Sequence, residues 1–471
     1  MNGKMQLCRV QTHLFIRNGR VYALDVAGMR VHDLSSAEAA ILSMSDDAFS
    51  AITSYPENDQ QTAKAIGDLQ ERGLLREERD MISPRFVRAD LALSNLMVNL
   101  SEVCNLSCRY CLAQQGSYGR EGGRMSEQTA CESIDFLIRQ SKEKEITVSF
   151  FGGEPLLNLQ AIKAIIKYSR EMEKNSGRKI IHHLTTNGTL FDEQTISFLK
   201  ESGCKVTVSL DGCQENHDRM RVFPDGRGSF DLICRWLLRL QDGYQENVQF
   251  ESTLHSETCD FAETARFLKR FRAGRIYIHH ARGFVKEFRL DDASLSIMKR
   301  AYSEFASYIL EDAIENGSTI LSAFSHFIST LASGKRARGY CAAGINLLSV
   351  SKEGRVYPCP GFVGREDYAL GDIRQGIDPD KMARLQERLA DVDNIPTCRS
   401  CWARYLCAGG CIAESAAING SPWQPDRYSC DLNRHIAELS IWIYAELLRQ
   451  RPDFFLSLQP IPEDIQRLMA S

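Results

Sequence analysis

The sequence predicts an α/β protein whose central part is a parallel sheet, either open or curled toward a barrel. Three observations lead to this prediction. Six short apolar stretches alternate with helical patterns through the middle of the chain. A strand-rich segment with two helices precedes them, and a cysteine-rich region with Gly, Pro and aromatic residues follows. The chain has 471 residues, enough for roughly two to four domains.

Residues 1–85 predict a small module of their own. Asn18-Gly19 is the strongest short signal for a hairpin. Ser35 followed by Glu38 predicts a capping box at the start of a helix. The expected strands are 13–17, 20–26 and 30–34, and the expected helices are 37–44 and 60–72. Strands followed by two short helices fit a winged-helix-like module, with a generic small α+β domain as the alternative.

The alternating pattern begins near residue 91. The expected strands are 96–100, 146–151, 180–185, 205–210, 248–254 and 276–279, with helices such as 127–139 and 159–174 between them. Sheets of this kind carry their chemistry at the carboxyl ends of the strands. Residues 285–333 predict helices that lead into the cysteine-rich region, and a helix with a Pro-containing tail is expected after Trp442.

The overall composition excludes several classes of protein. Hydrophobic residues make up 43% and charged residues 25%, as in soluble globular proteins. A net charge of −4 argues against a basic nucleic-acid-binding surface. No apolar run approaches the roughly 18 residues that span a bilayer, and the N-terminus has no secretory pattern. We therefore expect a cytoplasmic protein that binds neither nucleic acid nor membrane, so its 16 cysteines indicate metal or redox chemistry rather than disulfides.

Cys104, Cys108 and Cys111 follow directly after the first strand of the predicted sheet, with the spacing C-x3-C-x2-C. Three thiolates on one loop can hold three irons of a [4Fe–4S] cluster. The fourth iron then has no protein ligand and can bind a small molecule. A zinc site held only by thiolates would need a fourth cysteine, and its usual pairs are C-x2-C. Zinc or free thiols remain the alternative.

This motif resembles that of radical S-adenosylmethionine (SAM) enzymes. In that family the open iron chelates SAM, and one electron from the cluster cleaves it to a 5′-deoxyadenosyl radical. The family's companion motifs follow in order, each after a predicted strand: Gly152-Gly153-Glu154-Pro155, Thr186-Asn187-Gly188, Ser209-Leu210-Asp211-Gly212 and then Arg221. The resemblance therefore implies a partial (β/α)6 radical SAM barrel.

The resemblance also implies contacts to SAM. The carboxylate of Glu154 and the adjacent backbone would contact the SAM amino group, and Arg221 would pair with its carboxylate, with Arg219 as the rival. Tyr110 matches the aromatic position near adenine. The full implied set is Tyr110, Gly152, Gly153, Glu154, Asn187, Ser209, Asp211 and Arg221.

Seven further cysteines crowd into the C-terminal part: Cys341, Cys359, Cys398, Cys401, Cys407, Cys411 and Cys430. The last five follow the spacing C-x2-C-x5-C-x3-C, a gap, and a final Cys. This spacing resembles the SPASM extension of radical SAM peptide-modifying enzymes. That extension normally carries two auxiliary [4Fe–4S] clusters, which would make three clusters in all. By position, the second auxiliary cluster would bind Cys398, Cys401, Cys407 and Cys430, and the first would bind Cys341, Cys359 and Cys411. With no eighth cysteine, the first is expected to keep an open iron that could bind a substrate thiolate; a non-cysteine ligand or water is the alternative. Zinc or metal-free thiols are a further alternative for the whole group.

Short segments of the sequence narrow the choice among the activities known in this family. Sulfatase-maturing relatives carry an Asp directly after the position of Cys359, where this chain has Pro360, so that activity is disfavoured. The segment 357–364 instead resembles six-cysteine (SCIFF) peptide maturases. The pattern of Gly19, Asp25-Val26 and Val31-His32 resembles their leader-binding module, the RiPP recognition element. Quinohemoprotein amine dehydrogenase maturases share this organisation.

These resemblances imply an enzyme that forms thioether crosslinks, from Cys sulfur to carbon, in a Cys-containing precursor peptide or small protein bound by the N-terminal module. Flavodoxin or ferredoxin would supply electrons. Carbon–carbon crosslinking or epimerisation is the alternative chemistry, and an iron–sulfur scaffold with a degenerate SAM site is the non-enzymatic alternative. The implied domains are recognition module 1–85, barrel 91–285, helical connector 286–334, SPASM domain 335–435 and C-terminal helix with tail 436–471. No residue can be named as a catalytic base.

Overall fold

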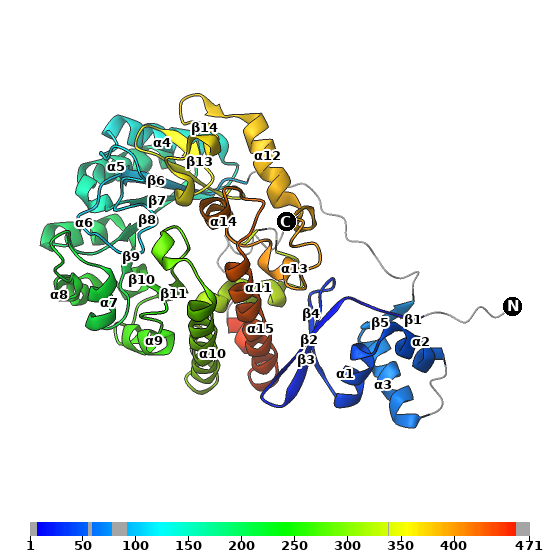
Figure 1. Ribbon diagram of the computed structural model, residues 1–471. Coiled ribbons are helices and arrows are strands. Elements are labelled where there is room, and N and C mark those ends of the chain that lie inside the picture. The colour runs from blue at the N-terminus through cyan, green and yellow to red at the C-terminus, as the bar shows by residue number, and fades with distance from the viewer. Residues whose placement is uncertain (1–6, 55–58, 78–91, 338, 458–471) are drawn as a thin grey trace.

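The computed structural model describes residues 7–54, 59–77, 92–337 and 339–457. A curved sheet covered by helices forms the larger part, and the N-terminal module lies to one side of it (Figure 1). The expected boundary near residue 85 and the end of the tail lie outside the described residues. No helix in the described ranges has the length and apolarity needed to cross a membrane.

The N-terminal module contains a three-stranded antiparallel meander. Its strands are β2 (Thr12–Arg17), β3 (Arg20–Asp25) and β4 (Arg30–Leu34), in that order. Asn18 and Gly19 both have positive φ at the hairpin turn, as the sequence predicts. The other elements are α1 (Ser36–Ser43), α2 (Asp46–Ser54), α3 (Gln60–Glu71) and the antiparallel pair β1 (Leu7–Arg9) and β5 (Leu75–Glu77). The capping box of Ser35 and Glu38 is confirmed, whereas α2 was not predicted.

Six parallel strands form the centre of the molecule, and all six predicted strands are confirmed. They are β6 (Asn95–Ser101), β7 (Glu145–Gly152), β8 (Lys179–Thr186), β9 (Lys205–Ser209), β10 (Val248–Leu254) and β11 (Arg275–His280). Their order in the sheet is their order in the chain. Since β6 and β11 do not pair with each other, the sheet curls without closing.

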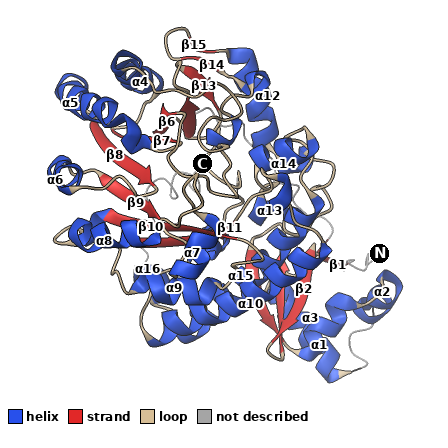
Figure 2. Ribbon diagram, turned by 60° about the vertical axis from the view of Figure 1, so that its left-hand side comes forward, coloured by secondary structure: helices blue, strands red, loops and turns tan. Residues whose placement is uncertain are grey.

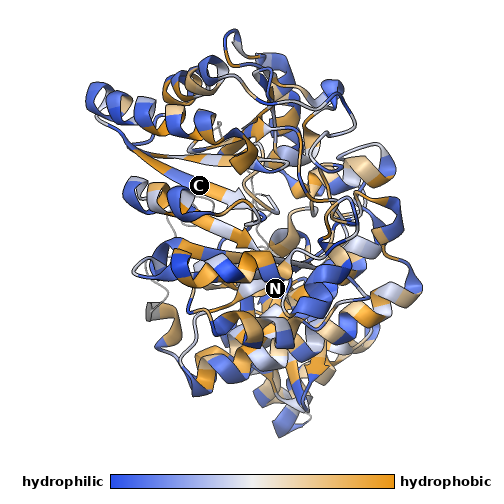
Figure 3. Ribbon diagram, turned by 90° about the vertical axis from the view of Figure 1, so that its left-hand side faces the viewer, coloured by the Kyte–Doolittle hydropathy of each residue, from blue (hydrophilic) through white to orange (hydrophobic). Residues whose placement is uncertain are grey.

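Helices cover the outer face of this sheet (Figure 2). They are α4 (Glu127–Gln140), α5 (Leu159–Ser176), α6 (Glu193–Ser202), α7 (Gln214–Met220), α8 (Phe230–Gln241) and α9 (Phe261–Lys269). Figure 3 shows hydrophobic residues along the strands and alternating hydrophobic and hydrophilic residues along the helices. The helices therefore bury one apolar stripe against the sheet. Because the six strands are parallel, their carboxyl ends all lie at one rim of the sheet.

The C-terminal part continues the same sheet. Helices α10 (Asp292–Glu315) and α11 (Ser325–Ser333) lead to β12 (Leu347–Val350), which pairs in parallel with β6. Then β13 (Arg355–Tyr357), β14 (Gly371–Asp372) and β15 (Gly376–Ile377) add antiparallel strands, giving a mixed sheet of ten. The remaining helices are α12 (Pro379–Ala390), α13 (Arg404–Cys407), α14 (Ile412–Asn419), α15 (Arg427–Gln450) and α16 (Phe454–Ser457).

Helix α15 joins three parts of the molecule. It packs along α10 and crosses the expected boundary at residue 436 without a break. The N-terminal module lies against it: Tyr22 donates a hydrogen bond to Glu446 (2.8 Å), and the Arg17 guanidinium lies 4.4 Å from the Trp442 ring. His13 stacks on Trp402 with ring centroids 3.6 Å apart. The module is thus fixed against the C-terminal region by buried polar and aromatic contacts.

Candidate functional site

The first cysteine loop lies at the carboxyl end of β6. Cys108 is buried, and Cys104 and Cys111 are half-buried. Burial raises the pKa of Cys104 and of Cys108 to about 12. Thiols that are this costly to ionise become thiolates only beside a strong positive charge, such as a bound metal centre. The donor set of three neighbouring thiols therefore fits an iron–sulfur cluster.

Hydrogen-bond donors surround the same sulfurs. The Leu106 amide donates to Cys104 Sγ at 3.4 Å, and the Asn187 side-chain amide approaches it at 3.7 Å. The guanidinium of Arg221 lies 4.0 Å from Cys108 Sγ. Donors to sulfur stabilise thiolate ligands and help to set the potential of a cluster.

Gly152 and Gly153 at the end of β7 pack directly on the backbone that enters the cysteine loop. A Cβ on Gly152 would lie 2.3 Å from the Ser101 carbonyl oxygen, and one on Gly153 would lie 2.2 Å from that of Val103. The Gly153 amide donates to the Ser101 carbonyl at 2.6 Å. The two glycines therefore fix the loop against β7, because no other residue allows this approach.

Glu154 connects this motif with the end of β8. Its carboxylate is fully buried and accepts hydrogen bonds from the amides of Asn187 (2.8 Å) and Leu156 (3.0 Å) and from the Thr186 hydroxyl (2.8 Å). Burial raises the pKa of Glu154 to about 7, although these three donors oppose the rise. Asn187 also donates to Asn105 Oδ1 at 3.0 Å, so the ends of β6, β7 and β8 form one polar network.

Asp211 organises the other side of the loop. It accepts hydrogen bonds from Arg221 Nε (2.9 Å), from the Thr253 amide (2.9 Å) and from the Tyr110 hydroxyl. The Arg221 guanidinium lies 5.3 Å from the centre of the Tyr110 ring. Arg219, the rival candidate, is exposed and pairs with Glu215 instead. The structure therefore brings Arg221, and not Arg219, to the cysteine loop.

The eight residues implied as SAM contacts thus lie at the carboxyl ends of β6 to β9, around Cys104, Cys108 and Cys111. Ser209 is the last residue of β9 and is half-buried. A carboxylate, Glu154, and a guanidinium, Arg221, flank the loop. This pair of opposite charges suits a ligand that carries both an ammonium and a carboxylate.

The seven C-terminal cysteines divide into two groups. Burial raises the pKa of Cys359, and the neighbouring Cys411 and Cys341 add to this rise. Burial likewise raises the pKa of Cys407, and Cys430, Cys398 and Cys401 add to it. The resemblance assigns these groups of three and four to two auxiliary clusters, and that assignment stays a prediction.

Across the described ranges, no three His, Cys, Asp or Glu side chains converge on a position for a single metal ion.

Arg282 is a residue that the sequence did not single out. It follows β11 and donates to the Tyr340 hydroxyl (2.8 Å) and to Glu414 (3.4 Å), which also accepts from the Gly283 amide (2.9 Å). Burial raises the pKa of Cys411 to about 11, and the Arg282 guanidinium opposes this rise. The last barrel strand is thereby tied to α14, the helix that follows Cys411.

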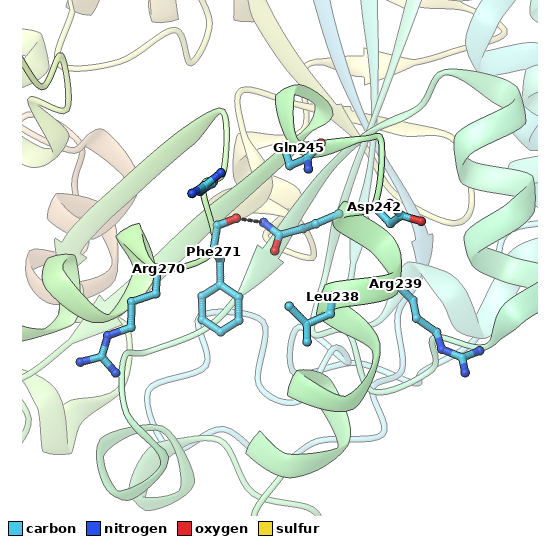
Figure 4. Close-up of a pocket in the computed structure, with 8 residues that line it drawn as sticks. Leu238, Arg239, Asp242, Gln245, Arg270 and Phe271 are labelled. Carbon is cyan, nitrogen blue, oxygen red and sulfur yellow. Dashed lines mark hydrogen bonds between the residues drawn. The ribbon is translucent and has the colours of Figure 1, made fainter.

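A pocket of about 500 Å³ lies elsewhere, between the end of α8 and the turn before β11 (Figure 4). Its lining includes Leu238, Asp242 and Phe271. Because Val248 and Arg275 begin the adjacent strands, this pocket lies at their amino ends, opposite the cysteine loop. We do not assign it to the chemistry.

Comparison with known proteins agrees with the geometry. Residues 98–268 match the family model described as Radical SAM superfamily. The chain is 25% identical to the radical SAM cyclopropyl synthase TigE of Paramaledivibacter caminithermalis, over 71% of each chain. It is 26% identical to a serine-type anaerobic sulfatase-maturating enzyme of Bacteroides thetaiotaomicron, over 74% of this chain and 90% of that protein.

Among solved structures, native anSMEcpe with bound AdoMet shares the fold, with a TM-score of 0.65 and 20% identity over 75% of this chain and 99% of that chain. The family implies a [4Fe–4S] cluster and SAM, and the three-cysteine loop with its polar surroundings fits both. We conclude that residues 98–268 of this chain are a radical SAM domain.

Proposed function

We propose that the protein uses SAM to form thioether crosslinks in a Cys-containing precursor peptide or small protein. The observation that carries this proposal is the position of the group Cys341, Cys359 and Cys411 beside the SAM loop. Burial raises the pKa of Tyr118, and both Cys111 and Cys359 add to the rise, so this side chain lies between the two cysteine groups. A substrate thiol bound at the group Cys341, Cys359 and Cys411 would be close to where the radical forms.

The SAM site would work through residues already described. Glu154 would accept from the SAM ammonium, and Arg221, oriented by Asp211 and Tyr110, would donate to its carboxylate. SAM bound at the cluster supplies a 5′-deoxyadenosyl radical that abstracts hydrogen. The protein's own task is to hold the two reacting groups together and to exclude water.

The C-terminal groups would hold two auxiliary [4Fe–4S] clusters. Cys341, Cys359 and Cys411 would bind the first, which would keep an open position for the substrate thiolate. Cys398, Cys401, Cys407 and Cys430 would bind the second. Flavodoxin or ferredoxin is the proposed electron donor.

The N-terminal module would capture the substrate. Its sheet has two outer strands, β2 and β4, and a peptide can add a strand to such an edge. Ile16 lies on the outer strand β2 and is 73% exposed, so its side chain is accessible to an added peptide strand. We expect Ile16→Asp to weaken peptide binding at least tenfold with SAM cleavage unchanged; equal losses of both would argue for a structural role of the module.

Carbon–carbon bond formation is the second candidate, because a cyclopropyl synthase is among the relatives. Either reaction removes two hydrogens from the peptide. Only a thioether consumes a thiol, so alkylation of free cysteines before mass spectrometry distinguishes the products.

The first experiment is the iron and sulfide content of anaerobically purified protein beside the variant with Ala at Cys104, Cys108 and Cys111. About twelve irons falling to about eight would support three clusters. About four irons in fully loaded wild type would refute the auxiliary clusters and the proposed role for them.

A further inference from the structure

Arg388 in α12 is buried to an unusual degree. It is 2% exposed and is among the largest side chains that are fully enclosed. Its Nε donates to the Pro422 carbonyl at 2.9 Å, and a terminal nitrogen approaches the Gly409 carbonyl at 3.4 Å. Both partners are neutral. A buried guanidinium normally pairs with a carboxylate, because an uncompensated charge in a protein interior is costly.

Neighbouring arginines have such a partner. Arg404 pairs with Asp393 at 2.8 Å, and Arg434 pairs with Asp431 at 2.5 Å. Within the described ranges, no Asp or Glu forms an ion pair with Arg388, and no carboxylate contributes to its pKa. The charge of Arg388 therefore lacks an obvious counter-ion.

The contact with Gly409 places Arg388 at the cysteine group, because Gly409 lies in the short loop between Cys407 and Cys411. The acidic side chains that act on the Arg388 guanidinium are the thiols of Cys398 and Cys407. A Cβ on Gly409 would lie 2.8 Å from a terminal nitrogen of Arg388, so this glycine leaves the space that the guanidinium occupies.

We propose that Arg388 is the counter-ion of the iron–sulfur cluster held by Cys398, Cys401, Cys407 and Cys430, and that it raises the reduction potential of this cluster. The inference rests on the second auxiliary cluster of the proposed function. A cluster with four thiolates carries net negative charge, and reduction adds one more. A fixed positive charge in a poorly solvated site therefore favours the reduced form.

The test compares Arg388→Gln, which removes the charge, with Arg388→Lys, which keeps it. Arg384→Gln, on an exposed position one turn earlier in α12, removes the same charge outside the core. Each full-length, reconstituted protein is titrated anaerobically, with the reduced clusters followed by electron paramagnetic resonance. The signal of the second auxiliary cluster is identified by its loss in Cys398→Ala.

We expect Arg388→Gln to lower the equilibrium constant for reduction of the second auxiliary cluster at least tenfold. For a one-electron step this moves the midpoint potential of its signal by about 59 mV to more negative values. The midpoint potential of Arg388→Lys should stay nearer to that of wild type, and the midpoint potential of Arg384→Gln should equal that of wild type. Full iron content with an unchanged midpoint in Arg388→Gln would overturn the inference alone. Should Arg388→Gln lose the cluster, Arg388→Lys must retain it, and failure to do so would also overturn the inference.

The two levels of the proposal fail differently. If wild type holds no iron that Cys398→Ala removes, the second auxiliary cluster and its counter-ion are both refuted. If that iron is present, the role of Arg388 is decided by the midpoint potential of the second auxiliary cluster in Arg388→Gln compared with wild type.

Discussion

Ionisation of Glu154 lowers the stability of the cluster-free protein as the pH rises. Burial raises the pKa of Glu154 from 4.5 to about 7, so the folded state holds the proton more tightly than the unfolded chain does. Below pH 4.5 the carboxyl is protonated in both states and contributes nothing. Above pH 7 it is ionised in both, and the folded state bears the full cost of about 3 kcal/mol.

The perturbation is Glu154→Gln, which cannot ionise. Between pH 5 and 8 we expect the free energy of unfolding of wild type, relative to the variant, to fall by about 2 to 3 kcal/mol. The loss should be steepest between pH 5 and 7, at about 1 kcal/mol per pH unit. The variant also loses an acceptor for the amides described above, which shifts its curve by a constant amount but leaves the pH-dependent difference.

The assay is urea unfolding of reduced, cluster-free protein at pH 5, 6, 7 and 8, followed by circular dichroism. Glu127→Gln, at an exposed position in the first turn of α4, serves as the matched control and should keep the wild-type pH profile. Parallel pH profiles for wild type and Glu154→Gln would refute the reasoning, because the buried carboxyl would then ionise as easily in the folded state as in the unfolded chain.

Three further predictions concern the loop and the N-terminal module. Gly153→Ala places a Cβ 2.2 Å from the Val103 carbonyl, so we expect about a third of the iron to be lost; full iron content would contradict this. Cys111→Ala should abolish SAM cleavage, measured as 5′-deoxyadenosine, and keep about two-thirds of the iron; continued cleavage would exclude this loop as the SAM cluster. Tyr22→Phe removes a buried hydrogen bond to Glu446 and should lower the free energy of unfolding by about 1 kcal/mol; an unchanged urea midpoint would show that the contact contributes nothing.

The central sheet was predictable because each strand is a short apolar run bounded by a helix, and the parallel arrangement follows from that alternation. The capping box at Ser35 was predictable because it is a local pattern within four residues, from Ser35 to Glu38. Helix α2 was missed because it has only nine residues and its apolar stripe consists of only two large side chains, Phe49 and Ile52. The expected boundary at residue 436 falls inside α15, because Cys430 lies in the first turn of a helix that continues to Gln450.

The site residues likewise divide into those that sequence motifs indicate and those that only the structure reveals. Motifs that follow successive strands indicate the residues around the cysteine loop, since parallel strands end at one rim. Arg282 and Arg388 have no such signal. Each is a single arginine whose partners, Glu414 and Gly409, are distant in sequence and are brought near only by tertiary packing. Spacing within one segment cannot reveal a contact of this kind.

The pairing of β12 with β6 has a consequence for synthesis of the chain. Residues 347–350 complete the edge of a strand made 250 residues earlier. Until they leave the ribosome, β6 exposes unpaired backbone groups along an apolar strand, which is a surface that promotes aggregation. The nascent barrel therefore depends on its last third to close that edge, and a fragment that ends after α11 should be insoluble even though it contains every residue of the radical SAM domain.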